Sequence, residues 1–165
     1  MQLYAAQSTP QPASAAALVH HRHDEVPELL NRARDHLDAA DEREPWMYNF
    51  DRTALAGHRG QCHLRLGRPA EAISAFTEGL AQLPTGHERR GAQLTIGLAQ
   101  AHLDAGDPDE ALFKAATALD VFAARGSASG LRRVRRMRDL LRNAGHHTAE
   151  EELDQRARAY LEAAS

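Results

Sequence analysis

The sequence is poor in aromatic residues, β-branched residues and lysine, and it contains a single cysteine. Phe, Trp and Tyr make up 5% of the 165 residues, while Ala, Leu, Arg and Glu are abundant. Straight-chain residues lose little rotamer freedom in a helix, so this composition favours helices over sheets. The hydrophobic share of 42% and the charged share of 26% are ordinary for a globular protein of about one domain. We therefore expect an all-α chain.

Cys62 is the only cysteine, so the chain cannot form an internal disulfide. We expect Cys62 to be a small buried hydrophobic residue rather than a nucleophile, because it stands at a helical position among apolar neighbours. The first nineteen residues have no basic stretch, and Pro10 and Pro12 interrupt their apolar run. We therefore expect neither a signal peptide nor a membrane span. Nineteen of the twenty basic residues are Arg, and only Lys114 is Lys. This excess of arginine favours a GC-rich bacterial coding sequence. The expected compartment is the bacterial cytoplasm.

A thirteen-residue segment occurs twice. QCHLRLGRPAEAI at residues 61–73 and QAHLDAGDPDEAL at residues 100–112 agree at seven positions and lie 39 residues apart. In each copy a glycine, Gly67 or Gly106, follows an apolar run, where a helix end needs a residue that tolerates a left-handed backbone. Each copy therefore predicts a helix, a tight turn and a second helix.

The starts of several helices can also be predicted. Pro69 and Pro108 stand at the first position of a new helix, where the missing N–H costs nothing, and Asp107 can cap the second of these helices. Thr and Glu three residues apart at 85–88 and again at 148–151 have the spacing of capping boxes. These boxes predict the starts of two further helices.

Both copies resemble the tetratricopeptide pattern, in which small residues lie where the two helices of a hairpin cross closely. The first copy supplies Gly60, His63, Ala72, Phe76 and Pro84. The second supplies Ala99, His102, Ala111, Ala115 and Ala118, but lacks the Phe and the closing Pro. One hairpin cannot bury its own apolar face, whereas stacked hairpins share a core and form a concave binding surface. The resemblance implies a tetratricopeptide-like helical-hairpin solenoid.

Periodicity and helix breaks extend this arrangement over most of the chain. We predict a flexible N-terminus at residues 1–12, followed by a single all-α domain at 13–165 with about eight helices. Four hairpins are expected, at about 13–41, 49–83, 86–124 and 128–163.

Residues 45–76, PWMYNFDRTALAGHRGQCHLRLGRPAEAISAF, are similar to the carboxy-terminal helical-repeat region of actinobacterial XRE-type helix-turn-helix transcriptional regulators. In that family, Trp and Tyr after a Pro precede a Phe-Asp pair, an AL-x-x-x-RG helix and an LGRPAEA turn. Residues 15–160 are compatible with the family, and the resemblance implies a sensory or interaction domain. No DNA-binding helix-turn-helix can be fitted before the first repeat, so we do not expect this chain alone to bind DNA.

The sequence contains no HExxH motif, nucleophile elbow, phosphate loop or dinucleotide fingerprint, so we expect no enzyme, no catalytic residue and no cofactor. HHRHDE at residues 20–25 is the densest group among ten histidines, but it lacks the i, i+4 order of helical metal ligands. We predict a solvated turn there rather than a metal site. His63 and His102 replace the Tyr of the repeat pattern and are expected to pack between hairpins.

The concave surface is expected to be lined by the first helices of the second and third hairpins. Helical geometry places along it a set of polar residues suited to a peptide backbone or to charge: Gln61, Arg65, Gln93, Gln100 and Asp104. Trp46 and Tyr48 are either core residues or an aromatic anchor at the mouth of this groove. A solvated groove without a strong ligand is the alternative.

Residues 131–142, LRRVRRMRDLLR, hold six Arg and one Asp in a chain of net charge −3. On a helical wheel the apolar residues share one side, and a basic face covers much of the other. Its residues are Arg132, Arg135, Arg136, Arg138 and Arg142. These arginines either are solvated or paired with the acidic residues at 150–154, or they bind nucleic acid or an acidic partner.

The sequence therefore predicts a non-catalytic module that binds a protein or peptide, or senses a small effector, and that is linked to transcriptional regulation. Binding of nucleic acid or an acidic partner through the basic helix 131–142 is the alternative. A homo-oligomer stays open, and no association with a membrane is expected.

Overall fold

The structure, a computed structural model, describes residues 28–29, 31–35 and 52–163. All regular structure in these residues is helical, and they contain no strand, as the composition predicts. Residues 28–29 and 31–35 are helical and fall within the first predicted hairpin, the rest of which lies outside the described residues. The labelled helices are α2 (Arg52–Arg65), α3 (Pro69–Ala81), α4 (Glu88–Asp104), α5 (Pro108–Ala124), α6 (Ala128–Asn143) and α7 (His147–Ala163).

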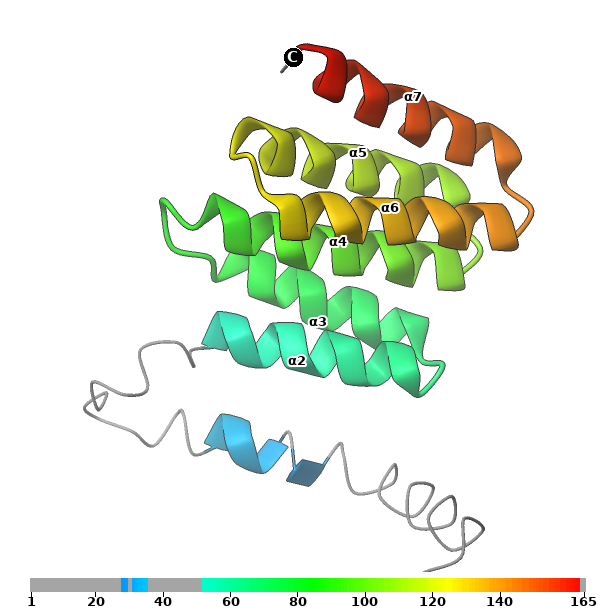
Figure 1. Ribbon diagram of the computed structural model, residues 1–165. Coiled ribbons are helices and arrows are strands. Elements are labelled where there is room, and N and C mark those ends of the chain that lie inside the picture. The colour runs from blue at the N-terminus through cyan, green and yellow to red at the C-terminus, as the bar shows by residue number, and fades with distance from the viewer. Residues whose placement is uncertain (1–27, 30, 36–51, 164–165) are drawn as a thin grey trace, which may run out of the picture.

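Consecutive helices run in opposite directions and pack in sequence order (Figure 1). The helices α2 and α3 pack together, as do α4 and α5, and α3 joins these two pairs by packing on α4. Contacts also join α2 to α4 and α4 to α6. The first helices of successive pairs therefore lie next to one another.

The helix breaks predicted at the repeated glycines are confirmed. Gly67 and Gly106 have φ values of 66° and 85°, in the left-handed region that favours glycine. Helices α3 and α5 begin at Pro69 and Pro108, and the Asp107 side chain accepts a hydrogen bond of 3.1 Å from the backbone N–H of Glu110. The local sequence thus sets the turn within each of these two helix pairs.

Both predicted capping boxes are wrong. Helix α4 begins at Glu88 itself, because Gly86, with a φ of 86°, turns the chain and moves Thr85 away from the cap position. Glu88 instead forms an ion pair of 2.7 Å with Arg125 at the end of α5. Helix α7 begins at His147, which places Thr148 inside the helix rather than before it.

The core between α2, α3 and α4 is built around the ring of Phe76. This residue of α3 is 1% exposed, and its ring lies against Gly60 of α2 and Gly97 of α4. A Cβ added at either glycine would lie 2.6 Å from a ring carbon, closer than packed carbon atoms approach. The close crossing predicted at Gly60 is confirmed, and Gly97 provides a second one that the repeat comparison did not identify.

The second core cluster joins α4, α5, α6 and α7. Ala115 of α5 is fully buried at the position where the first copy has Phe76, and Phe122, two turns further along α5, supplies the aromatic ring. That ring packs against Gly130 of α6. On α6 itself, Val134, Met137 and Leu141 are buried, as its apolar spacing predicts, and Leu131 and Leu140 are half-buried. No helix in the described ranges is both long and apolar enough to cross a membrane.

Replacing Gly130 with Ala tests this packing. The new Cβ would overlap Cγ and Cβ of Phe122, and because the backbone fixes Cβ of Phe122, this contact cannot be relieved by side-chain rotation alone. Overpacking of this kind costs about 1–3 kcal/mol, so we expect a clear fall in the free energy of unfolding, measured by urea denaturation. Gly57→Ala is the matched control, because its Cβ meets only the terminal Cδ2 of Leu94. If both variants unfold at the same urea concentration, this account of the core is wrong.

Candidate binding groove

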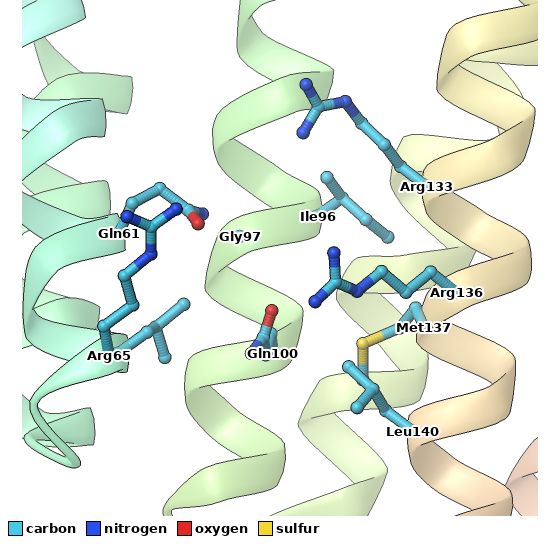
Figure 2. A pocket seen from close by; sticks show the side chains of 10 residues that line it. Gln61, Arg65, Ile96, Gly97, Gln100, Arg133, Arg136, Met137 and Leu140 are labelled. Atoms are coloured by element: carbon cyan, nitrogen blue, oxygen red, sulfur yellow. The ribbon is translucent and has the colours of Figure 1, made fainter. Parts of the chain in front are cut away.

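A groove of about 220 Å³ crosses the surface formed by α2, α4 and α6 (Figure 2). The side chains of Gln61 and Arg65 reach into it from α2, and those of Arg133 and Arg136 reach toward α4 from α6. Its lining residues are Gln61, Leu64, Arg65, Ile96, Gly97, Gln100, Arg133, Arg136, Met137 and Leu140.

A second hollow of about 310 Å³ adjoins the first and shares Gln61 and Arg133 with it. It is lined by the N-terminal part of α2 and by Arg90, Gln93 and Leu94 of α4, together with other residues. We call the two hollows together the α2–α4–α6 groove. The shared residues make it an elongated channel, a shape that suits an extended chain better than a compact small molecule.

The Arg, Lys, Asp and Glu residues that the structure describes in this groove are all positively charged. No Asp or Glu is among the described residues that line either hollow. The guanidinium groups of Arg65, Arg133 and Arg136 are exposed, and none forms an ion pair or hydrogen bond with another side chain in the part of the chain that the structure describes. Three cations therefore face one channel without a counter-ion.

The structure brings together most of the groove residues that the sequence suggests. Gln61, Arg65 and Gln100 line the first hollow, and Gln93 lines the second. Asp104 lines neither hollow; it is the exposed last residue of α4, and partial desolvation raises the pKa of its carboxyl group. Its expected role in reading charge within the groove is therefore not supported. Trp46 and Tyr48 lie outside the described residues.

The structure divides the basic face of α6 into parts with different surroundings. Arg138 and Arg142 pair with α7: Arg138 Nη1 lies 2.7 Å from Asp154 Oδ1, and Arg142 Nη2 lies 2.6 Å from Glu150 Oε1. The expected pairing with the acidic last helix is thus confirmed for these two arginines. Arg136 instead lines the groove.

The other arginines of α6, Arg132, Arg133 and Arg135, do not share one environment. Arg132 and Arg135 are exposed, and Arg135 lines a small hollow between α5, α6 and α7 rather than the groove. Arg133, which the predicted basic face omits, does line the groove. Its position could have been inferred, because residues 133, 136 and 140 repeat at helical spacing on one side of α6. Sequence reasoning missed it by treating the helix and the groove as separate sites.

The histidines do not form a site in the described ranges. No group of three or more His, Cys, Asp or Glu side chains there is placed to hold a metal ion, and HHRHDE at 20–25 lies outside those ranges. His63 and His102 are half-buried. Burial is the main cause that lowers the pKa of His63.

No family model, curated protein or solved structure matches the chain.

The ion pair between α6 and α7 makes stability depend on pH. The hydrogen bond from Arg138 is the main cause that lowers the pKa of Asp154 from its ordinary value of 3.8. Because the pKa is lower in the folded state, the stabilisation is fully present above the ordinary value and is lost as the pH falls through the folded value. Asp154→Asn should therefore lower the free energy of unfolding by on the order of 1 kcal/mol at neutral pH.

Urea denaturation at neutral and strongly acidic pH measures this difference, which should disappear in acid. Glu151→Gln is the control: Glu151 is exposed on the same helix, and its replacement should change stability little at either pH. A difference between wild type and Asp154→Asn that does not change with pH would contradict the assignment.

The pairing of Arg138 and Arg142 also limits binding of nucleic acid. Four arginines of α6 remain without an acidic partner among the described residues, namely Arg132, Arg133, Arg135 and Arg136. At roughly −0.9 per neutralised phosphate, these four arginines can contribute a slope of at most about −3.6 to the log–log dependence of duplex DNA affinity on salt. We expect no measurable duplex binding at physiological salt, measured by fluorescence anisotropy. A sub-micromolar complex at that salt, lost when Arg132, Arg135 and Arg136 are changed to Glu, would contradict this expectation.

Proposed function

We propose that the chain is a non-catalytic, tetratricopeptide-like module that binds a protein or peptide in the α2–α4–α6 groove. The observation that carries the proposal is the groove itself: the first helices of successive helix pairs line one channel with glutamine amides and with three guanidinium groups, those of Arg65, Arg133 and Arg136, that have no ion pair among the described residues. Amide side chains donate and accept hydrogen bonds, as a peptide backbone requires.

The repeat supports the proposed solenoid arrangement. Helix pairs α2/α3 and α4/α5 have the same glycine break and the same proline start, 39 residues apart. The small residues of the pattern are buried where these helices meet, and Ala72 and Ala111 are fully inaccessible to solvent. In such arrays the first helices line the concave surface, and this surface usually binds the partner.

A regulatory role is part of the proposal. The similarity of residues 45–76 to the repeat region of XRE-type transcriptional regulators supports a sensory or interaction domain linked to transcription in the bacterial cytoplasm. Residues 52–76 of this segment form α2 and most of α3, so they include one wall of the groove. A peptide is favoured over a small effector, because the groove is an open channel rather than an enclosed cavity.

Selection from a random peptide library displayed on phage tests this function. Peptides enriched on the full-length protein should lose at least about tenfold in affinity, or 1.4 kcal/mol, when Gln61, Arg65 and Gln100 are all changed to Ala. Isothermal titration calorimetry measures the affinity. Circular dichroism should show unchanged helicity and melting, because Gln61 and Arg65 are exposed and Gln100 is half-buried.

Ser74→Ala with Thr77→Ala is the control, since both residues are exposed on α3 and line neither hollow. This double variant should bind the selected peptides as the wild type does. If no peptide is enriched, or if every enriched peptide binds the triple variant equally well, the groove is not a peptide site.

A further inference from the structure

We propose that the occupant of the α2–α4–α6 groove is an extended, Asp- or Glu-rich segment of a partner protein. This inference rests on the proposed peptide-binding function and names the chemistry of the peptide. It joins two features that are separate in the sequence, because the structure places part of the basic helix α6 inside the groove lined by Gln61 and Gln100.

Charge complementarity is the first argument. Arg65 approaches from α2, while Arg133 and Arg136 approach from the opposite wall on α6 (Figure 2). No carboxylate among the described residues pairs with any of the three, whereas Arg59, Arg125, Arg138 and Arg142 all have acidic partners. The planar guanidinium group binds a carboxylate through two parallel hydrogen bonds. Three of the arginines that remain available for such bonds therefore line the groove.

Spacing is the second argument. Arg133 and Arg136 are three residues apart on α6, which places their Cβ atoms roughly 5–6 Å apart. In an extended peptide, side chains two residues apart lie on the same face and are separated by about 6.6 Å. Two acidic residues at alternate positions would therefore match these two arginines. The opposite wall supplies Arg65 for a further carboxylate, and Ile96 of α4 and Leu140 of α6 can contact aliphatic parts of the peptide.

The surroundings of the groove favour an acidic peptide over nucleic acid. A duplex carries one phosphate charge per roughly 1.7 Å of its axis and needs a long basic surface. Beyond the groove, α6 faces Glu150 and Asp154 of α7, which already neutralise Arg142 and Arg138. A short peptide contacts only the groove, where no acidic side chain among the described lining residues opposes it.

Fluorescence anisotropy with a defined probe tests the inference. The probe is a fluorescein-labelled nonapeptide in which Glu and Ser alternate, with an acetylated N-terminus and an amidated C-terminus, and its counterpart has Gln in place of every Glu. Charge-assisted hydrogen bonds are about twice as strong as neutral ones. We therefore expect the full-length protein to bind the Glu peptide at least about tenfold more tightly than the Gln peptide at physiological salt, a difference of 1.4 kcal/mol.

Two double variants of the same helix identify the arginines responsible. Arg133→Gln with Arg136→Gln removes two charges from the groove, and Arg132→Gln with Arg135→Gln removes two exposed charges that do not line it. Both variants change the net charge equally. We expect the groove variant to lose at least about tenfold in affinity for the Glu peptide. The control should lose less than about twofold, because exposed charges outside the groove are screened by salt.

Several results would overturn the inference while leaving the groove a peptide site. These are equal affinity for the Glu and Gln peptides, an equal loss in both double variants, or no binding of the Glu peptide by protein that binds library-selected neutral peptides. A single-stranded oligothymidylate that binds more tightly than the Glu peptide, and loses affinity in the groove variant, would assign the arginines to nucleic acid. Failure of the library selection, by contrast, would remove the peptide-binding function itself.

Discussion

The ring of Phe76, held between two glycines, determines how the first helices are spaced. Gly60 on α2 and Gly97 on α4 have no side chain, so the backbones of both helices can approach the ring of Phe76, which α3 supplies. A buried ring in close packing cannot shift without disturbing its neighbours, because protein interiors are nearly as dense as organic crystals. Gly97 also lines the groove, Gln61 directly follows Gly60, and Gln100 lies about one helical turn after Gly97. The packing that brings α2 beside α4 therefore also brings the polar groups of the groove together.

Helix α6 is positioned by a similar contact and by charge. Phe122 packs against Gly130 near the start of α6, and Met137 and Leu141 are buried further along it. The ion pairs of Arg138 and Arg142 with α7 lie on another side of the helix, so apolar burial and electrostatic pairing together fix its rotation. This rotation turns Arg133 and Arg136 toward α4. Surface ion pairs contribute little energy individually, but here they decide which arginines stay available.

Local backbone chemistry made much of the fold predictable, and long-range contacts limited what could be predicted of the site. Gly67, Gly106, Pro69 and Pro108 act within a few residues, so the C-terminal ends of α2 and α4 and the starts of α3 and α5 follow from the sequence. The capping box at 85–88 failed because the nearby Gly86 turns the chain, which residue spacing alone does not reveal. The glutamines of the groove were predicted from helical periodicity. Arg133 was not, because its place depends on how α6 packs against α4.

The groove departs from the local consistency of the rest of the structure. Elsewhere in the described chain, apolar residues fill the core and several arginines pair with carboxylates. In the groove, three arginines converge without an acidic partner among the described residues, and like charges near one another destabilise the folded state. Proteins tolerate such local conflicts mainly at functional sites, and a ligand that binds only the folded state offsets their cost by mass action. A bound carboxylate would relieve this repulsion, so the unfavourable charge of the free groove and its preference for an acidic segment have one electrostatic cause.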